Sequence, residues 1–504
     1  MKYSPKHLYA AVFVLICIFL CFRIPFYQQR LVGEEGIFAH LFLSEVQKPN
    51  YLLISRVDGI NQMGVPQHPA PMYVAINVLG KATRSFLDFT RLDELRSASL
   101  LRLIFSLPLL FLFVSALIYV HKKRNTNLYY WLALFLCFIS SPVVLVTSTE
   151  LQVDASFGIT IFGIWVLAIL ALTSRPGTCR AKGGLLLLGS FIASLGKNEW
   201  SLVLFLSMLL VTAYVALRRR EIPSAGEQLT VLSFGFAGIM LGNLASYLYD
   251  PLNYALGFEL MSSMSKQESI FNDSKWLRLM GTMKVRSGYV AQNILLLMTC
   301  SFIFLKSVLR APVMERAVTI ILPLAGLYFL SLWSAYLLVD VLTFLVPLAV
   351  LVFMVRSASA LVPGSVPLDP LTLLPVVFSG LLFLAYFIST WEVGPRYFSL
   401  ALTMSLFALL GVMGHCSATV ERKLVVNLTL CILVLNCVSY LNLDSYQRVV
   451  ERLPKSAQQR GTDCLPVMSS GQAVFGSMDF LGGACSKEYF EEMSKKHNRP
   501  LCVD

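Results

Sequence analysis

The chain has 504 residues, of which 56% are hydrophobic and only 14% are charged. A soluble domain of ordinary composition carries about a quarter charged residues, so this composition excludes a soluble globular enzyme. The net charge of +12 could suggest nucleic-acid binding. The lysines and arginines, however, lie in short clusters just after apolar runs, which is typical of the cytoplasmic loops of membrane proteins. Nucleic acid is therefore not an expected partner.

Apolar runs of about 17 to 21 residues recur along the whole chain, and each is long enough for a helix to cross ~30 Å of hydrocarbon. We predict an all-α polytopic membrane protein with about thirteen transmembrane helices. The predicted spans are Leu8–Ile24, Leu100–Val120, Leu128–Val146, Phe157–Thr173, two short helices within Gly184–Leu217, Leu229–Leu248, Ala291–Leu309, Ala317–Leu338, Val341–Val355, Leu371–Thr390, Phe398–His415 and Leu424–Leu441.

The basic clusters predict the orientation, because Lys and Arg favour the cytoplasmic side. Lys2 and Lys6 place the amino terminus inside. The later clusters are His121–Arg124, Arg175–Lys182, Arg218–Arg220, Lys306–Arg316 and Arg422–Lys423. If Gly184–Leu217 were one helix, the later clusters would face the wrong side, so we expect two helices that meet at a polar elbow, Gly196–Trp200.

This topology predicts a transmembrane domain, residues 1–441, with outer loops at residues 25–99 and 250–290. Residues 442–504 form a tail on the outer face. The tail contains Cys464, Cys485 and Cys502. Two of these could pair in an oxidising compartment, or all three could be free thiols.

Acidic residues collect at the predicted outer ends of the spans, whereas the spans themselves are nearly free of charge. These acids include Glu34, Glu35, Asp58, Glu150, Asp154, Glu199, Asp250, Asp340 and Glu392. A transporter usually has ionisable residues or helix breaks within its spans. Carboxylates at one surface instead suit a site where a lipid-borne substrate meets a partner that arrives from outside.

The first outer loop contains the most informative patterns. Glu34 and Glu35 precede apolar residues at helical spacing, which predicts an amphipathic helix in the membrane interface. Acids at the start of a helix can also be simple caps. The turn Gln67–Tyr73, with His68 and two prolines, suits the start of another interfacial helix.

The order of these features resembles the first outer loop of the GT-C membrane glycosyltransferases, in the branch of the protein O-mannosyltransferases and aminoarabinose lipid A transferases. Where that family has Asp-Glu-Gly, this chain has Glu34-Glu35-Gly36, and its Pro-Pro-Leu-Tyr turn becomes Pro69-Ala70-Pro71-Met72-Tyr73. The start of the second span resembles the family's Ala-Ala-Arg. Later similarities are Asp154, Gly196-Lys197 and Gly394-Pro395-Arg396-Tyr397.

The resemblance implies a hexosyl- or pentosyltransferase that moves a sugar from a polyprenyl-phosphate donor to an acceptor hydroxyl at the outer face. Glu34 is the expected general base, and Glu35 and Asp154 are the other catalytic candidates. Candidates for binding the donor phosphate are Lys81, Arg84, Lys197 and Arg396. Candidates for binding the acceptor or the sugar are His68, Tyr73 and Glu150.

No cofactor is predicted, and a divalent metal stays open because the chain has no clean Asp-x-Asp motif. The acceptor could be a lipid, a polysaccharide or a protein. The expected location is a bacterial inner membrane, with the site on the periplasmic side. The alternative function is a transporter, flippase or polymerase of lipid-linked saccharides.

Overall fold

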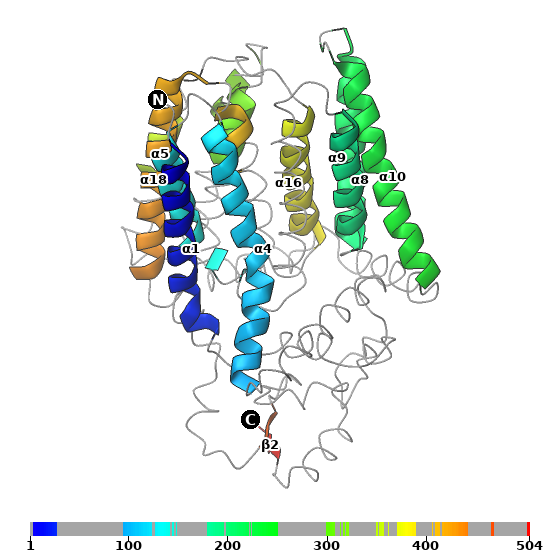
Figure 1. The fold of residues 1–504 in the computed structure, drawn as a ribbon. Coiled ribbons are helices and arrows are strands. Elements are labelled where there is room, and N and C mark those ends of the chain that lie inside the picture. The colour runs from blue at the N-terminus through cyan, green and yellow to red at the C-terminus, as the bar shows by residue number, and fades with distance from the viewer. Residues whose placement is uncertain are drawn as a thin grey trace, which may run out of the picture.

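A computed structural model of the chain describes residues 4–27, 94–122, 127–141, 144–145, 148, 179–195, 198–220, 222, 224–249, 299–307, 313, 316–317, 319–321, 349–350, 352–356, 361, 370–389, 406, 409–413, 416–441, 465–467 and 501–503. This part of the chain is almost entirely helical, and its long helices stand side by side along a common direction (Figure 1). The helices are α1 (Pro5–Tyr27), α4 (Glu94–Lys122), α5 (Leu128–Ile139), α8 (Cys179–Ser194), α9 (Asn198–Leu217), α10 (Ala225–Tyr249), α16 (Pro370–Ser389) and α18 (Ala418–Leu441).

Four of the described helices are long and apolar enough to cross a membrane: Pro5–Ile24, Arg102–Lys122, Trp200–Leu217 and Ala225–Leu248. Leu128–Ile139 and Leu373–Leu382 are shorter apolar helices. Large apolar side chains point outward from these helices, for example Tyr9, which is 71% exposed, and Phe13, which is 67% exposed. Lipid rather than water is the medium that such surfaces suit. The chain is therefore compatible with an integral membrane protein, while the predicted total of about thirteen spans extends beyond the described residues.

Helices α1, α4, α5 and α18 pack together as one group. His7 contacts Tyr129 near the starts of α1 and α5, and Arg23 contacts Ile139 near their ends. Helices α1 and α5 therefore run in the same direction. Glu421 and Asn436 of α18 contact successive turns of α5, so α18 is parallel to both. The short connection from Lys122 to Asn127 makes α4 antiparallel to α5.

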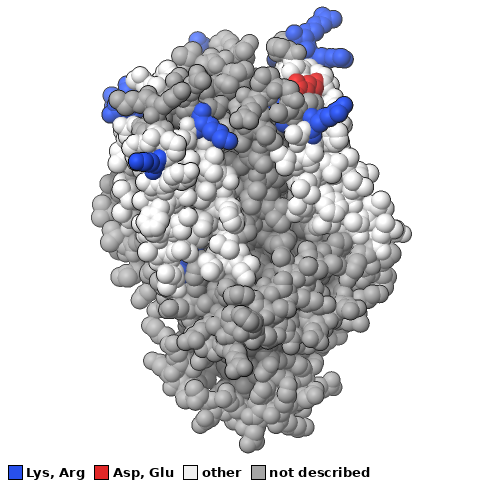
Figure 2. Space-filling model, in the orientation of Figure 1, with Lys and Arg blue, Asp and Glu red and all other residues white. Residues whose placement is uncertain are grey.

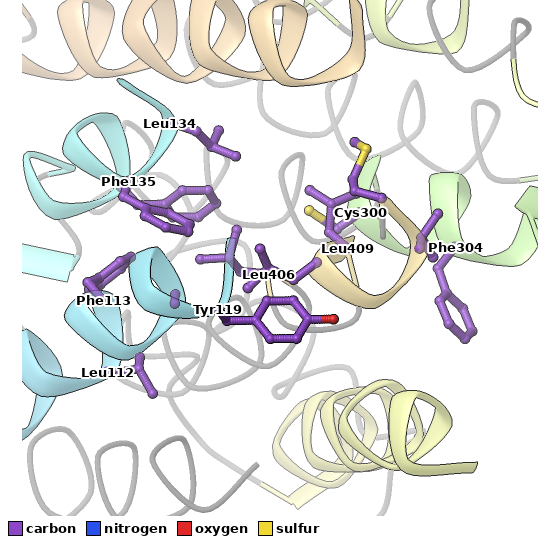
Figure 3. Close-up of a cluster of buried hydrophobic side chains, with 14 of the residues drawn as sticks. Leu112, Phe113, Tyr119, Leu134, Phe135, Cys300, Phe304, Leu406 and Leu409 are labelled. Atoms are coloured by element: carbon purple, nitrogen blue, oxygen red, sulfur yellow. The ribbon is translucent and has the colours of Figure 1, made fainter. Parts of the chain in front are cut away.

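A large apolar core joins this group to two other parts of the described chain, residues 299–307 and residues 406 and 409–413. The rings of Phe113 in α4 and Phe135 in α5 meet edge to face, with centroids 5.6 Å apart. Figure 3 shows side chains of α4, of α5 and of both of these other parts of the chain meeting in this core. The labelled residues are Leu112, Phe113, Tyr119, Leu134, Phe135, Cys300, Phe304, Leu406 and Leu409. Aromatic and leucine side chains thus bring together segments almost 300 residues apart in sequence.

Helices α8 and α10 pack by close approach of their backbones. A Cβ added at Gly238 would collide with the Leu187 carbonyl oxygen, and one added at Gly242 would collide with the Ser194 hydroxyl. Small residues allow such close contact between membrane helices, whose association has little hydrophobic driving force in lipid. Leu187 lies opposite Gly238, and the later residue Ser194 lies opposite the later residue Gly242. Helices α8 and α10 therefore run parallel.

The predicted elbow within Gly184–Leu217 is confirmed, because α8 ends at Ser194 and α9 begins at Asn198. The hydrogen bond from Asn243 of α10 to Ser201 of α9 joins the end of α10 to the start of α9. Helix α9 therefore runs antiparallel to α8 and α10. The first of the two helices begins earlier than predicted, at Cys179.

Helix α5 is shorter than the predicted span Leu128–Val146. Ser140 caps it just ahead of Pro142, and a proline disfavours helical backbone in the residue before it.

Exposed lysines and arginines gather at one end of the bundle, which is uppermost in Figure 2. We call this the basic end. It contains the start of α1, the end of α4, the start of α8, the end of α9 and the start of α18, with Lys6, Lys122, Arg180, Arg218, Arg219, Arg220, Arg422 and Lys423. The helix directions agree with those predicted for the corresponding spans. The opposite end of the bundle is called the far end.

Two short strands, β1 (Leu465–Val467) and β2 (Leu501–Val503), pair in parallel with Leu465 opposite Leu501. They belong to the predicted tail, residues 442–504. Strand β2 lies beyond the far end of the helices in Figure 1, on the side away from the start of α1. The paired strands are thus separated from the basic end by the length of the bundle.

Candidate functional site

At the basic end, α18 buries one carboxyl group. Glu421 is in the first turn of α18, where the helix dipole favours negative charge. It is only 4% exposed, and the indole nitrogen of Trp131 donates a hydrogen bond of 2.8 Å to its Oε1. Trp131 is among the largest fully buried side chains of the described chain. This contact fixes the start of α18 against α5.

The position of Glu421 changes its acidity. The residue lies just ahead of the apolar stretch Leu424–Leu441. Burial raises the pKa of Glu421 from an ordinary 4.5 to about 7, although the hydrogen bond from Trp131 acts to lower it. The carboxyl group therefore exchanges its proton near neutral pH.

The two residues before Trp131 in α5 are also aromatic, and each contacts a neighbouring helix. The hydroxyl of Tyr129 is 2.6 Å from Nδ1 of His7 in α1. The guanidinium of Arg422 lies over the ring of Tyr130, 5.4 Å from its centroid. Three consecutive aromatic residues of α5 thus contact α1 and α18 at the basic end and join these helices.

At the far end, α1 buries a cation. Ala11, Leu15, Phe19 and Arg23 recur at intervals of four residues, which places them on one face of α1, and all four are buried. The first three pack in the apolar core. Arg23 ends this stripe with no exposed surface at all, and it is one of the largest fully buried side chains of the described chain.

Hydrogen bonds from its guanidinium connect Arg23 to two other segments. Nη2 and Nε donate to the Ser148 hydroxyl oxygen at 2.8 and 3.1 Å. Nη1 lies 3.4 Å from the carbonyl oxygens of Phe19 and Ile139. Ser148 in turn donates its proton to the Leu145 carbonyl oxygen. Both lone pairs and the proton of this hydroxyl are therefore used.

Local electrostatics favour a cation at this place. Arg23 lies one turn before the end of α1, and its guanidinium contacts the carbonyl oxygen of Ile139, the last residue of α5. The negative end of the α5 dipole therefore faces the guanidinium. The guanidinium carbon also lies 3.7 Å from the centre of the Phe19 ring, within the range of a cation–π contact. Arginine keeps its charge in any protein environment, so these contacts offset the cost of burying that charge.

A second polar cluster lies at the far end, where α8, α9 and α10 meet. The amide of Asn243 donates to the Ser201 hydroxyl at 2.9 Å and to the Ile239 carbonyl at 2.8 Å. Ser194, Ser201 and Ser246 are buried beside it. The connection between α8 and α9, which contains Gly196 and Lys197, begins and ends at this cluster.

The ten predicted site residues themselves lie outside the described residues. They are Glu34, Glu35, His68, Tyr73, Lys81, Arg84, Glu150, Asp154, Lys197 and Arg396. Their roles stay predictions. Among the residues that the structure describes, no group of three His, Cys, Asp or Glu side chains comes together as a metal site.

Two buried charged residues were missed by sequence reasoning. Arg23 falls within the predicted span Leu8–Ile24, where a single cation is hidden by the high average hydropathy of its neighbours. An ionisable residue inside a span is by itself a signal of function, and this signal could have singled out Arg23. Glu421 stands beside the basic pair Arg422-Lys423, and nothing in the local sequence predicts its contact with Trp131, 290 residues away.

Comparison of the chain with models of protein families, with characterised proteins and with solved structures finds no match.

Proposed function

We propose that the protein is a membrane glycosyltransferase that moves a sugar from a polyprenyl-phosphate donor to an acceptor hydroxyl at the far end of the bundle. In this proposal the far end faces the periplasm of a bacterial inner membrane, because the basic end has the charge that favours the cytoplasmic side. The order of motifs in residues 30–103, which resembles the first outer loop of the GT-C glycosyltransferases, is the main reason for proposing this reaction.

The observation on the structure that best supports the proposal is the position of the helix ends. The segment between Tyr27 of α1 and Glu94 of α4 leaves and rejoins the bundle at the far end. It contains Glu34, Glu35, His68, Tyr73, Lys81 and Arg84. Every predicted site residue in this segment is therefore connected to the same end of the bundle.

Two further connections start from the far end. Ser148, which contacts Arg23, is followed in sequence by Glu150 and Asp154. Lys197 lies in the connection from α8 to α9. Of the ten predicted site residues, Arg396 is the one that we do not connect to the far end through a described helix end. Distant parts of the sequence could thus contribute to one site at this end.

The proposed reaction is a single displacement at the anomeric carbon. The acceptor oxygen forms a bond to that carbon while the bond from the carbon to the phosphate oxygen breaks, and the polyprenyl phosphate leaves with the electron pair. Glu34 accepts the proton of the acceptor hydroxyl. Lys81, Arg84, Lys197 and Arg396 are the candidates that would stabilise the negative charge of the departing phosphate.

The apolar helices have a role in this mechanism. A polyprenyl donor is soluble only in the bilayer, so the site must lie where the lipid phase meets water. Large apolar side chains on the outward faces of α1, α9 and α10 offer a surface compatible with lipid over most of the bundle length. Because the reaction takes place at one surface, it needs no polar path across the bilayer between the described helices.

A transporter, flippase or polymerase of lipid-linked saccharides is the second candidate. A transporter is expected to line a path through the bilayer midplane with polar or ionisable groups. The buried charged side chains among the described residues are Arg23, Arg102, Lys306 and Glu421. Arg23 and Glu421 lie near opposite ends of the bundle, and this separation favours an enzyme with its site at one surface.

Replacement of Glu34 tests the base assignment. Purified protein in lipid nanodiscs is supplied with polyprenyl-phosphate sugars and with lipid, polysaccharide and peptide acceptors, and products are measured by mass spectrometry. Glu34→Gln should lower the rate of transfer by about 100-fold or more, since the amide cannot accept the proton. Glu35→Gln is the matched control and should lower the rate much less, because adjacent helical residues face different directions. Near-normal transfer by Glu34→Gln would show that another group is the base.

A further inference from the structure

We propose that Arg23 is a positioning residue for the far-end site, which it serves by holding the end of α1 against the segment around Ser148. This inference rests on the proposed function. It is carried by the contacts of Arg23, because these join two parts of the chain that lead to predicted catalytic carboxylates.

The contacts are specific to a guanidinium. Its Nε and Nη2 reach the same Ser148 oxygen, and Nη1 is directed toward the last carbonyl group of α5. Lysine has a single nitrogen and cannot make this forked set of bonds. Hydrogen bonds in which the donor is charged are shorter and stronger than those between neutral groups. Arg23 therefore fixes the distance between α1 and the Ser148 segment more firmly than apolar packing alone.

Burial of the charge also has a cost, which apolar packing would avoid. A buried ionic or polar contact is often less stabilising than well-packed apolar residues of similar volume. Leu15 and Phe19 show that the same face of α1 packs well against the core without polar atoms. Leucine at position 23 would suit stability better than a buried arginine. A requirement for a defined geometry at the far end explains why arginine is present there.

The chain connects this contact directly to the candidate site. Glu34 is eleven residues after Arg23, and Glu150 and Asp154 follow Ser148 by two and six residues. Loosening the contact would allow the two segments to move independently. A misplacement of about 1 Å in a catalytic group can lower a rate by about 100-fold.

The test combines kinetics with hydrogen exchange in lipid nanodiscs. Arg23→Gln should lower kcat by about 10- to 100-fold while KM for the donor stays within about threefold. Arg23→Lys should give an intermediate kcat. Adding Ser148→Ala to Arg23→Gln should cause little further loss, because residues that act through one contact are not additive.

Glu421→Gln is the control, since it alters a buried charged residue at the opposite end of the same helix group and should leave kcat unchanged. Backbone amides of residues 139–148 should exchange at least about tenfold faster in Arg23→Gln than in the unaltered protein. The control should not accelerate exchange there. Ser148→Ala gives a second way to weaken the contact if Arg23→Gln does not fold.

The inference is overturned if exchange at residues 139–148 is unchanged in Arg23→Gln and in Ser148→Ala, or if exchange rises while kcat is preserved. Absence of transfer by the unaltered protein would refute the proposed function and, with it, the catalytic part of the inference. The exchange experiment needs no substrate, so it still decides whether Arg23 holds the two segments together.

Discussion

The α1, α4, α5 and α18 group buries charged side chains of opposite sign toward its two ends. At the basic end, surrounded by exposed lysines and arginines, the buried group is the Glu421 carboxyl. Toward the far end, where the sequence predicts a collection of acids, the buried groups are the guanidinium of Arg23 and that of Arg102 in the first half of α4. Glu421 and Arg23 each have the sign of charge that the adjacent helix end favours.

The chemical difference shows how the ends could serve different purposes. Glu421 can gain a proton near neutral pH, so the cost of its burial is limited to about that of a hydrogen-bonded neutral acid. Arg23 cannot lose its charge and must be satisfied by its partners at any pH. A permanent, fully bonded cation suits a fixed geometry, and we assign the fixed geometry to the end with the candidate site.

The largest effect on stability at the basic end is expected for Trp131→Phe. This change removes the donor to Glu421 and leaves a space beside Phe135, whose ring centroid lies 5.8 Å from that of Trp131. The expected loss is about 2 to 4 kcal/mol. Thermal unfolding in nanodiscs measures it, and sugar transfer by the variant at a temperature where it stays folded should be normal.

A double-mutant cycle isolates the hydrogen bond from the loss of volume. Trp131→Phe should cost less in a Glu421→Gln background, because the neutral amide suffers less than a carboxylate from loss of the donor. Equal costs in the two backgrounds would mean that the Trp131–Glu421 contact adds nothing to stability. Loss of transfer in Trp131→Phe would show that the two ends are not functionally separate.

A smaller effect is expected from the pH dependence of stability. The folded-state pKa of Glu421 is raised, so its contribution is fully present below about pH 4.5 and is lost as the pH rises through about 7. The thermal midpoint of the unaltered protein should therefore fall relative to that of Glu421→Gln between about pH 5 and pH 8. All other groups are the same in both proteins, so their contributions cancel in the difference.

The far end gives the comparison for this titration. The difference between unaltered protein and Arg23→Gln should not change over the same pH range, since arginine keeps its charge and glutamine has no proton to lose. A flat difference for Glu421→Gln, or a steep one for the Arg23 variant, would contradict the contrast between the ends.

Features set by neighbouring residues were predictable from the sequence. The break between two helices within Gly184–Leu217 and the common side of the basic clusters follow from local composition, and both agree with the helices and their directions. The predicted elbow, Gly196–Trp200, extends too far, because α9 already begins at Asn198. The end of α5 was misplaced, because hydropathy continues through Val146 while the backbone preference before Pro142 stops the helix at Ile139.

Contacts between distant segments were not predictable. Glu421 and Trp131 are 290 residues apart, and Arg23 and Ser148 are 125 residues apart. In its local sequence, Glu421 is a charge that flanks an apolar stretch, and Arg23 is one charged residue within an apolar run. Their pairing depends on which helices become neighbours, and a hydropathy pattern contains no information about that choice.

The proposed reaction is tested most directly by the lipid that the protein retains. The unaltered protein and Glu34→Gln are purified in nanodiscs, and bound lipids are measured by mass spectrometry before and after an acceptor is added. The account predicts a polyprenyl-phosphate sugar in both samples, and its loss on addition of acceptor only in the unaltered protein. Absence of any polyprenyl lipid from both proteins, or equal loss from both, would contradict it.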